Sequence, residues 1–70
     1  MSREMELRHL ELANRHIAEG EQRIAEQKAL IADLDRRGRD AATAHELLEA
    51  FEETLDLMMR HRDLILDKLA

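Results

Sequence analysis

Four histidines are the residues in this sequence with the most versatile chemistry. His9 and His16 lie seven residues apart, and His45 and His61 follow in the second half of the chain. Imidazole binds transition metals and titrates near neutral pH, so a histidine pair beside a carboxylate could form a metal site or a pH switch. The Glu-x-x-His motif of di-iron bundles occurs once, at Glu6, without the further inward carboxylates that such sites need. We therefore interpret the histidines as partly solvated side chains and predict no metal.

The other residue types that catalysis requires are scarce. The only serine is Ser2, there is no cysteine, and neither a glycine-rich phosphate loop nor a facing pair of carboxylates can be identified. Arg62 is the one charged residue in an otherwise apolar helical pattern. It could hold an anionic ligand, but we favour a side chain that reaches the surface and pairs there with a neighbouring acid such as Glu19 or Glu21. The sequence predicts a protein that is not an enzyme and has no cofactor.

Length and composition predict one small all-α domain, residues 1–70. The chain has 70 residues, two glycines, no proline and no cysteine, which favours long helices. A chain this short buries little apolar surface, so it usually needs disulfides, a metal or oligomerisation, and the lack of cysteine excludes disulfides. No apolar run approaches the roughly 18 residues that span a bilayer, so we expect no membrane partner and a cytoplasmic location.

The first helix is predicted at about residues 3–37. Ser2 is its expected N-cap, and Gly38 is the residue that ends it in a left-handed conformation. A heptad pattern marks its core positions. Each heptad has two core positions. The first is occupied by Leu10, Ile17, Ile24 and Ile31, and the second, three residues later, by Ala13, Gly20, Gln27 and Leu34.

A turn at about residues 38–40 leads to a second helix at about residues 41–69, with Asp40 as its expected N-cap. The core positions of this helix are spaced alternately four and three residues apart: Ala44, Leu48, Phe51, Leu55, Met58, Arg62, Ile65 and Leu69. Because the turn is short, the two helices must be antiparallel neighbours, as in a coiled coil. This register places Ile24 near Leu55. We expect Gly20 to allow close approach of another side chain.

More apolar residues lie outside these two patterns than one hairpin can cover. The candidates for an interface are Leu47, Ala50, Leu57, Met59, Leu64 and Leu66. A row of exposed leucines marks an interaction surface, and twofold pairing of hairpins into a four-helix bundle is the simplest way to bury it. We therefore predict a homodimer that serves as a non-enzymatic oligomerisation or protein-interaction module, an adaptor or regulator. An additional protein partner is compatible with this function.

Basic and acidic residues lie on different helices, and this pattern leaves an alternative function open. Arg8, Arg15 and Arg23 line one edge of the first helix, whereas the outside of the second is acidic. Pairing between the helices of the bundle explains this pattern, but the edge could instead bind structured RNA. The net charge of −5 disfavours nucleic acid as a partner. A bundle that binds a metal or a small ligand is the third hypothesis.

Two segments carry a resemblance to known sequences: RHIAEGEQRIAEQKALIADL at residues 15–34, and LLEAFEETL at residues 47–55. Together with Gly38-Arg-Asp40 they resemble short hypothetical proteins of bacterial genomes. The likeness covers about residues 9–66 and implies a bacterial cytosolic protein, but no activity and no functional residue. In architecture the predicted hairpin also resembles a plasmid-copy-control hairpin that dimerises and binds paired RNA loops. The edge with Arg8, Arg15 and Arg23 would be its nearest counterpart to the RNA-binding residues.

Overall fold

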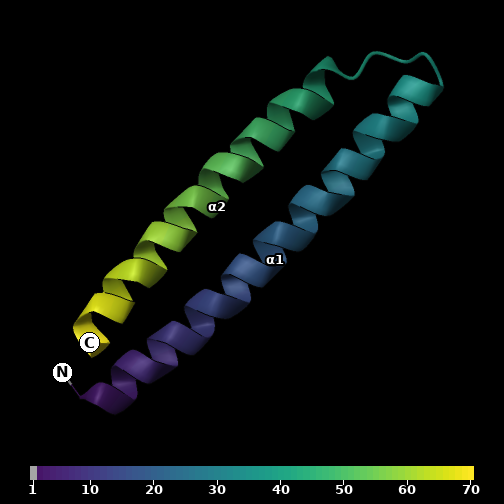
Figure 1. Cartoon of the computed structure of the whole chain (residues 1–70). Coiled ribbons are helices and arrows are strands. Elements are labelled where there is room, and N and C mark those ends of the chain that lie inside the picture. The colour runs from purple at the N-terminus through teal and green to yellow at the C-terminus, as the bar shows by residue number, and fades with distance from the viewer. Residues whose placement is uncertain (1) are drawn as a thin grey trace.

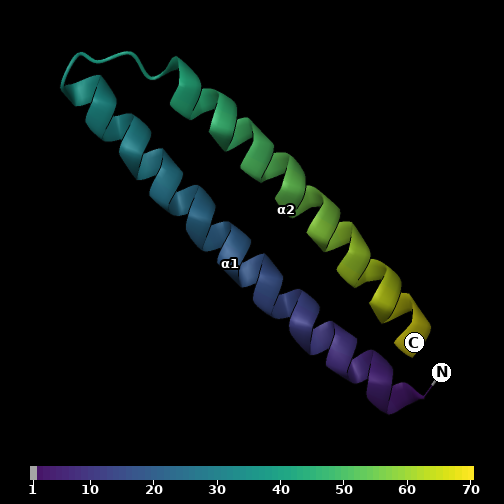
Figure 2. The same ribbon diagram turned by 180° about the vertical axis from the view of Figure 1, so that it is seen from behind.

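The computed structural model describes residues 2–70 and consists of two long helices side by side (Figure 1). Helix α1 spans Arg3–Arg36 and helix α2 spans Ala42–Leu69. The chain reverses direction between them, so both termini lie at one end of a rod that measures 54 × 14 × 13 Å (Figure 2). This arrangement confirms the predicted all-α antiparallel hairpin. The pairing of two hairpins into a bundle stays a prediction.

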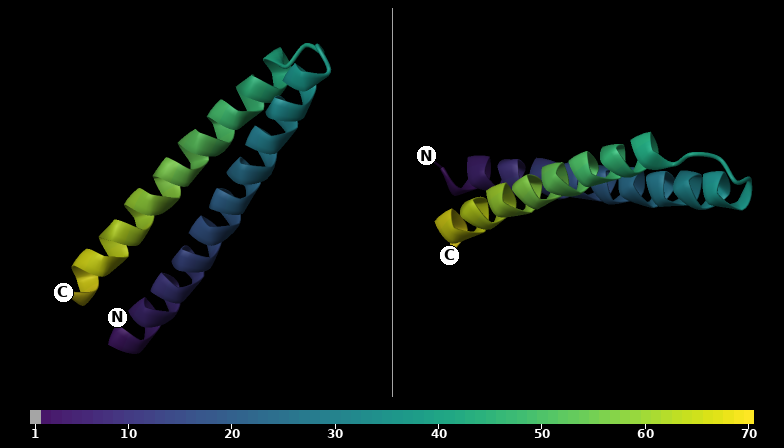
Figure 3. Two further views of the ribbon diagram at one scale, coloured as in Figure 1. Left: turned by 45° about the vertical axis from the view of Figure 1, so that its right-hand side comes forward. Right: turned by 90° about the horizontal axis from the view of Figure 1, so that it is seen from above.

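The two helices are not strictly parallel rods. Seen from above, α2 crosses α1 at a shallow angle (Figure 3). A slight crossing of this kind lets core side chains of one helix enter the gaps between those of the other along the whole length. Neither helix of residues 2–70 is long and apolar enough to cross a membrane.

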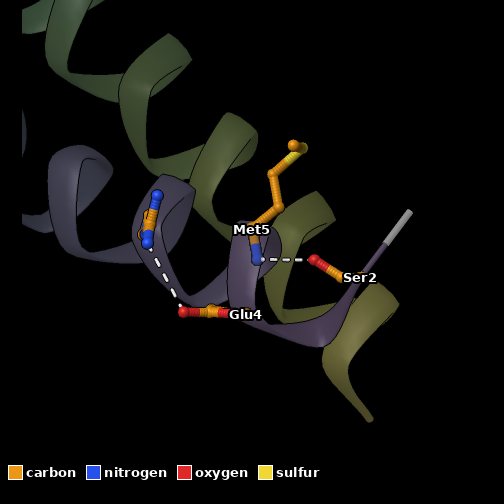
Figure 4. Close-up of polar contacts among 4 residues, drawn as sticks. Ser2, Glu4 and Met5 are labelled. Carbon is orange, nitrogen blue, oxygen red and sulfur yellow. Dashed lines mark hydrogen bonds and ion pairs between the residues drawn. The ribbon is translucent and has the colours of Figure 1, made fainter.

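Both ends of α1 form as the local sequence predicts. The Ser2 hydroxyl oxygen accepts a hydrogen bond of 3.2 Å from the backbone N–H of Met5, which confirms the N-cap (Figure 4). At the other end Gly38 adopts a left-handed φ of 65°. The backbone N–H of Arg39 then donates to the carbonyl of Leu34 at 2.9 Å. This bond satisfies one of the carbonyls that a helix end leaves free, so the helix stops at Arg36.

Helix α2 begins differently from the prediction. Its N-cap is Ala41, which has no capping side chain, and not Asp40. The Asp40 carboxylate instead accepts a hydrogen bond of 2.9 Å from the N–H of Ala42, two residues along. Ala41 is buried, and the helix starts at Ala42, one residue later than predicted. Asp40 therefore still satisfies one free N–H, but through an Asx turn and not as the cap.

The core of the rod is one thin line of side chains between the helices. Its buried apolar residues are Ala13, Ile17, Ile24, Ile31, Ala41 and Ile65. Most core positions of α2 are only half-buried, and no large side chain among residues 2–70 is completely enclosed. Two helices can cover only one face of each other, so this core is thin for geometric reasons.

Contacts across the hairpin agree with the expected neighbours in the middle of the rod. A methyl group on Gly20 would lie 3.4 Å from Leu55 Cδ1 and 3.6 Å from Met58 Sδ. Leu55 also lines the same groove as Ile24. Side chains of α2 therefore lie against Gly20, at distances that would also accept an alanine, and Leu55 lies against Gly20 as well as beside Ile24.

Candidate interaction face

Three of the four histidines gather in one shallow groove between the helices near the termini. His9 and His16 of α1 and His61 of α2 line it, whereas His45 lies at the opposite end of α2. The Nδ1 atom of His9 is 3.8 Å from the Glu6 carboxylate, and all three histidines of the groove are exposed. Among residues 2–70 no three histidine, aspartate or glutamate side chains are placed to share a metal ion. The groove brings imidazoles together without forming a ligand set.

Glu6 is a buried residue that sequence reasoning missed. It is 6% exposed, and its Oε2 atom is buried without a hydrogen-bond partner among residues 2–70. Glu6 lies seven residues before Ala13, so it extends the core pattern of α1 towards the N-terminus. That heptad spacing is the signal that could have identified it. The His9 Nδ1 atom lies 3.8 Å from the Oε2 atom of Glu6, beyond hydrogen-bond distance, so no hydrogen bond among residues 2–70 offsets the cost of burying it.

Arg62 pairs with a different acid from the two expected. Its Nη2 atom lies 3.5 Å from the Asp63 carboxylate, while its Nε atom is buried without a hydrogen-bond partner among residues 2–70. The expected pairing with a neighbouring acid is confirmed, but that acid is Asp63 and neither of the two examples named, Glu19 and Glu21. The Arg62 side chain is 32% exposed, with its Nε atom buried and its Nη2 atom beside its own neighbour in sequence. Arg62 therefore reaches the surface as expected, but without linking the helices.

The predicted basic edge of α1 is exposed but partly occupied by neighbouring side chains. Arg8 forms an ion pair of 3.4 Å with Glu4, one turn earlier. The Arg23 guanidinium lies 5.9 Å from the centre of the Phe51 ring, within the range of a cation–π contact. Arg15 shares a shallow hollow with acidic as well as basic side chains. The edge therefore presents mixed charge and not a continuous basic surface.

The most exposed large apolar side chains of the described residues lie on α2. Leu57 and Leu64 are 63% and 62% exposed, and they are one heptad apart on the same side of the helix. They belong to a longer row whose members are spaced alternately three and four residues apart. This leucine line consists of Leu47, Ala50, Thr54, Leu57, His61, Leu64 and Lys68. It contains no acidic residue.

The six predicted interface residues divide between two sides of α2. Leu47, Ala50, Leu57 and Leu64 belong to the leucine line. Met59 and Leu66 lie on the other side, where Met59 borders a groove with Glu52 and Asp56. That second side, the acid edge, carries Glu49, Glu52, Asp56 and Asp63. The leucine line thus contains no acid of its own, although Glu46 and Glu53 lie one turn from its members on the outward side of α2, and the opposite side is rich in carboxylates.

Comparison of the chain with protein-family models, with curated proteins and with solved structures finds no match. The resemblance to short bacterial proteins and the bacterial origin that it implies therefore stay predictions.

Proposed function

We propose that this protein is a non-enzymatic helical oligomerisation and protein-interaction module, an adaptor or regulator that works as a homodimer. The observation that carries the proposal is the exposure of Leu57 and Leu64 within the acid-free leucine line. Burial of apolar surface contributes about 25 cal/mol per Å². A continuous row of exposed leucines is therefore a surface that gains free energy from being covered. As part of the same proposal we place the protein in the cytoplasm, because a chain without cysteine suits a reducing compartment.

The thin core supports self-association. The six buried apolar residues of the hairpin are partly alanines, and none is completely enclosed. Small domains with so little core usually gain stability from oligomerisation when they have no disulfide. A second hairpin laid against the first would convert the single line of side chains into the broader core of a four-helix bundle.

The size of the hairpin also suits a dimer. One side of the rod is 54 Å long and 14 Å wide. A face of these dimensions is comparable to the roughly 800 Å² per partner that specific protein interfaces bury. One flat side of the hairpin is thus large enough for a stable interface with a second copy.

Sedimentation at micromolar concentration tests this proposal. We expect twice the chain mass of 8.2 kDa. The double variant Leu57→Ser/Leu64→Ser should sediment as a monomer, because it removes the most exposed apolar side chains. Glu49→Ser/Asp56→Ser, two exposed positions seven residues apart on the acid edge of the same helix, is the matched control and should stay dimeric. A native chain that remains monomeric throughout this range would contradict the proposal.

The alternative of RNA binding through Arg8, Arg15 and Arg23 has less support. Arg8 is engaged by Glu4 and Arg23 by Phe51, and the chain carries a net charge of −5. Binding of structured RNA that weakens steeply with salt, and that is lost in an Arg15→Gln variant, would favour this function instead.

A further inference from the structure

We propose that two copies of the hairpin pair in reversed orientation, so that their leucine lines run antiparallel and meet around Leu57. The turn of each copy then lies beside the termini of the other. This inference rests on the proposed function, because it specifies the surface and the geometry of that self-association. It assigns one side of the hairpin, built from both helices, as the interface.

Both helices contribute to this side, which we call the pairing face. On α2 it consists of the leucine line. On α1 it consists of a second row, spaced alternately four and three residues apart: Met5, His9, Leu12, His16, Glu19, Arg23, Glu26, Leu30 and Asp33. The two rows border the same groove, since His9, Leu12 and His16 line it together with His61 and Lys68.

Exposed apolar residues concentrate on the pairing face. Six of the eight exposed large hydrophobic residues belong to its two rows: Met5, Leu12, Leu30, Leu47, Leu57 and Leu64. The other two, Leu7 and Leu66, lie on the opposite side of the hairpin. That side also holds the acid edge of α2. Covering it with a second copy would bury several carboxylates of like charge, which is unfavourable without partners.

A second hairpin can be placed on the pairing face of the first in two arrangements with twofold symmetry. A twofold axis along the rod keeps the turns at the same end and lays α1 of one copy on α2 of the other. A twofold axis across the rod reverses the second hairpin and lays each helix on its own copy. Neighbouring helices are antiparallel in both cases, so helix dipoles do not distinguish the two arrangements. The side chains do.

The leucine line is suited to pair with its own copy. Leu57 lies near the midpoint of α2, which spans Ala42–Leu69. Ala50 precedes it by seven residues and Leu64 follows it by seven. When two such lines run antiparallel around Leu57, each Leu64 meets the small Ala50 of the second copy. Leu57 meets its own copy at the centre, the large Leu64 faces the small Ala50, and the acids nearest to the line, Glu46 and Glu53, lie at the outer margin of the contact.

Charges on the α1 row favour the same orientation. Its first four members, which include His9 and His16, contain no acidic residue, whereas Glu19, Glu26 and Asp33 follow among the other five. Reversal lays the acid-free first members of each row over the last members of the other, so that Asp33 of one copy is kept away from Asp33 of the second. With the turns at one end, the histidines would instead lie over His61 and Lys68 of the second copy.

A distance measurement between spin labels tests the orientation. The chain has no cysteine, so Arg39→Cys places one label beside the turn. Reversed pairing predicts a label separation close to the 54 Å length of the rod. Pairing with the turns together predicts about 10–20 Å, the width of adjacent helices. A label at Glu53→Cys, near the middle of α2, should give a short distance in either arrangement and reports that pairs have formed.

Matched leucine variants test the pairing face. Leu7 and Leu12 are both 47% exposed on α1 but lie on opposite sides. We expect Leu12→Glu to weaken dimerisation by about tenfold or more and Leu7→Glu to leave it unchanged. Leu57→Glu and Leu66→Glu form the equivalent pair on α2. Sedimentation measures the dimer, and circular dichroism verifies that each variant is helical.

The outcomes separate the two proposals. A native chain without dimers overturns the proposed function and this inference together. Dimers with short distances between turn labels overturn the reversed orientation and leave the proposed function standing. Dimers that are weakened by Leu7→Glu and Leu66→Glu, but not by Leu12→Glu and Leu57→Glu, overturn the pairing face. If a glutamate variant fails to fold, the label at residue 39 still decides the orientation, because it leaves the pairing face intact.

Discussion

At the scale of single residues, the core line contains two buried polar side chains, and only one of them has all of its buried polar atoms hydrogen-bonded. Gln27 is 8% exposed, and its Nε2 atom donates a hydrogen bond of 2.9 Å to the carbonyl of Ala44 at the start of α2. Glu6 is equally buried, but one of its carboxylate oxygens has no hydrogen-bond partner among residues 2–70. A satisfied amide in the core helps to fix the register of the helices, whereas an unsatisfied carboxylate weakens it. The register between the two helices is therefore fixed more firmly near the turn than near the opposite end of the hairpin.

Replacement of Gly20 by alanine should stabilise the protein. The space left by the glycine accepts a methyl group, with Leu55 and Met58 at ordinary van der Waals distances, and alanine favours a helix interior by about 1 kcal/mol. We expect the free energy of unfolding in urea to rise by about 0.5–1 kcal/mol in Gly20→Ala. Gly20→Leu should lower it by about 1–3 kcal/mol, because its larger side chain has no room.

The exposed Ala18 on the same helix provides the control for helix propensity alone. Ala18→Gly should lower the free energy of unfolding by about 1 kcal/mol. A loss of stability in Gly20→Ala would mean that Leu55 and Met58 pack more closely on the glycine than the structure shows.

At the scale of the helices, α1 and α2 use their apolar residues differently. The isoleucines of α1 occupy one narrow line and are buried. Helix α2 carries apolar residues over a wider arc, so the contact with α1 leaves Leu57 and Leu64 outside. A helix whose apolar arc exceeds what one neighbour covers is characteristic of a bundle of more than two helices. This difference between the helices is the structural basis of the proposed self-association.

Truncation of Ile24 and Leu55 tests the packing in the middle of the rod. Both side chains line the same groove, and Ile24 is 9% exposed. We expect Ile24→Ala and Leu55→Ala each to lower the free energy of unfolding by about 2–4 kcal/mol. Because they are neighbours, the double variant should show a coupling above about 0.5 kcal/mol.

Two exposed glutamates of the same region serve as controls for these truncations. Glu26→Ala and Glu53→Ala should each change stability by less than about 0.5 kcal/mol. An Ile24→Ala variant as mild as Glu26→Ala would show that the core line of α1 is assigned incorrectly.

At the scale of the whole molecule, a rod of 54 × 14 × 13 Å has an unusually large surface for its volume. Its stability has to come from the packing along the two helices and, in our proposal, from the second copy. The histidine groove contributes no ligand set that could add metal binding energy to folding.

Removal of metal should therefore leave the protein unchanged. We expect the melting temperature to be the same before and after treatment with a chelator, because no three potential ligands of residues 2–70 converge. A variant with His9, His16 and His61 all replaced by glutamine is the matched control and should respond in the same way. A fall of several degrees with chelator that zinc reverses in the native chain, and not in this variant, would establish a metal site.

The sequence by itself determined the helical hairpin. Heptad spacing of Leu10, Ile17, Ile24 and Ile31, the Ser2 cap and the glycine after α1 all act through contacts within a few residues. Such interactions depend little on the remainder of the chain, and a short turn leaves antiparallel packing as the only arrangement. These features could be predicted because their physical causes are local.

Only the tertiary structure decided which side chains are exposed and which of them share a side of the hairpin. The rotation of each helix about its axis determines that Arg62 emerges beside Asp63, that Glu6 is buried, and that the exposed leucines of α2 share a side with His9 and His16. Rotation and register follow from the fit of two complete rows of side chains, including the gap at Gly20. This fit is a collective property of both helices, and no single residue or spacing contains it.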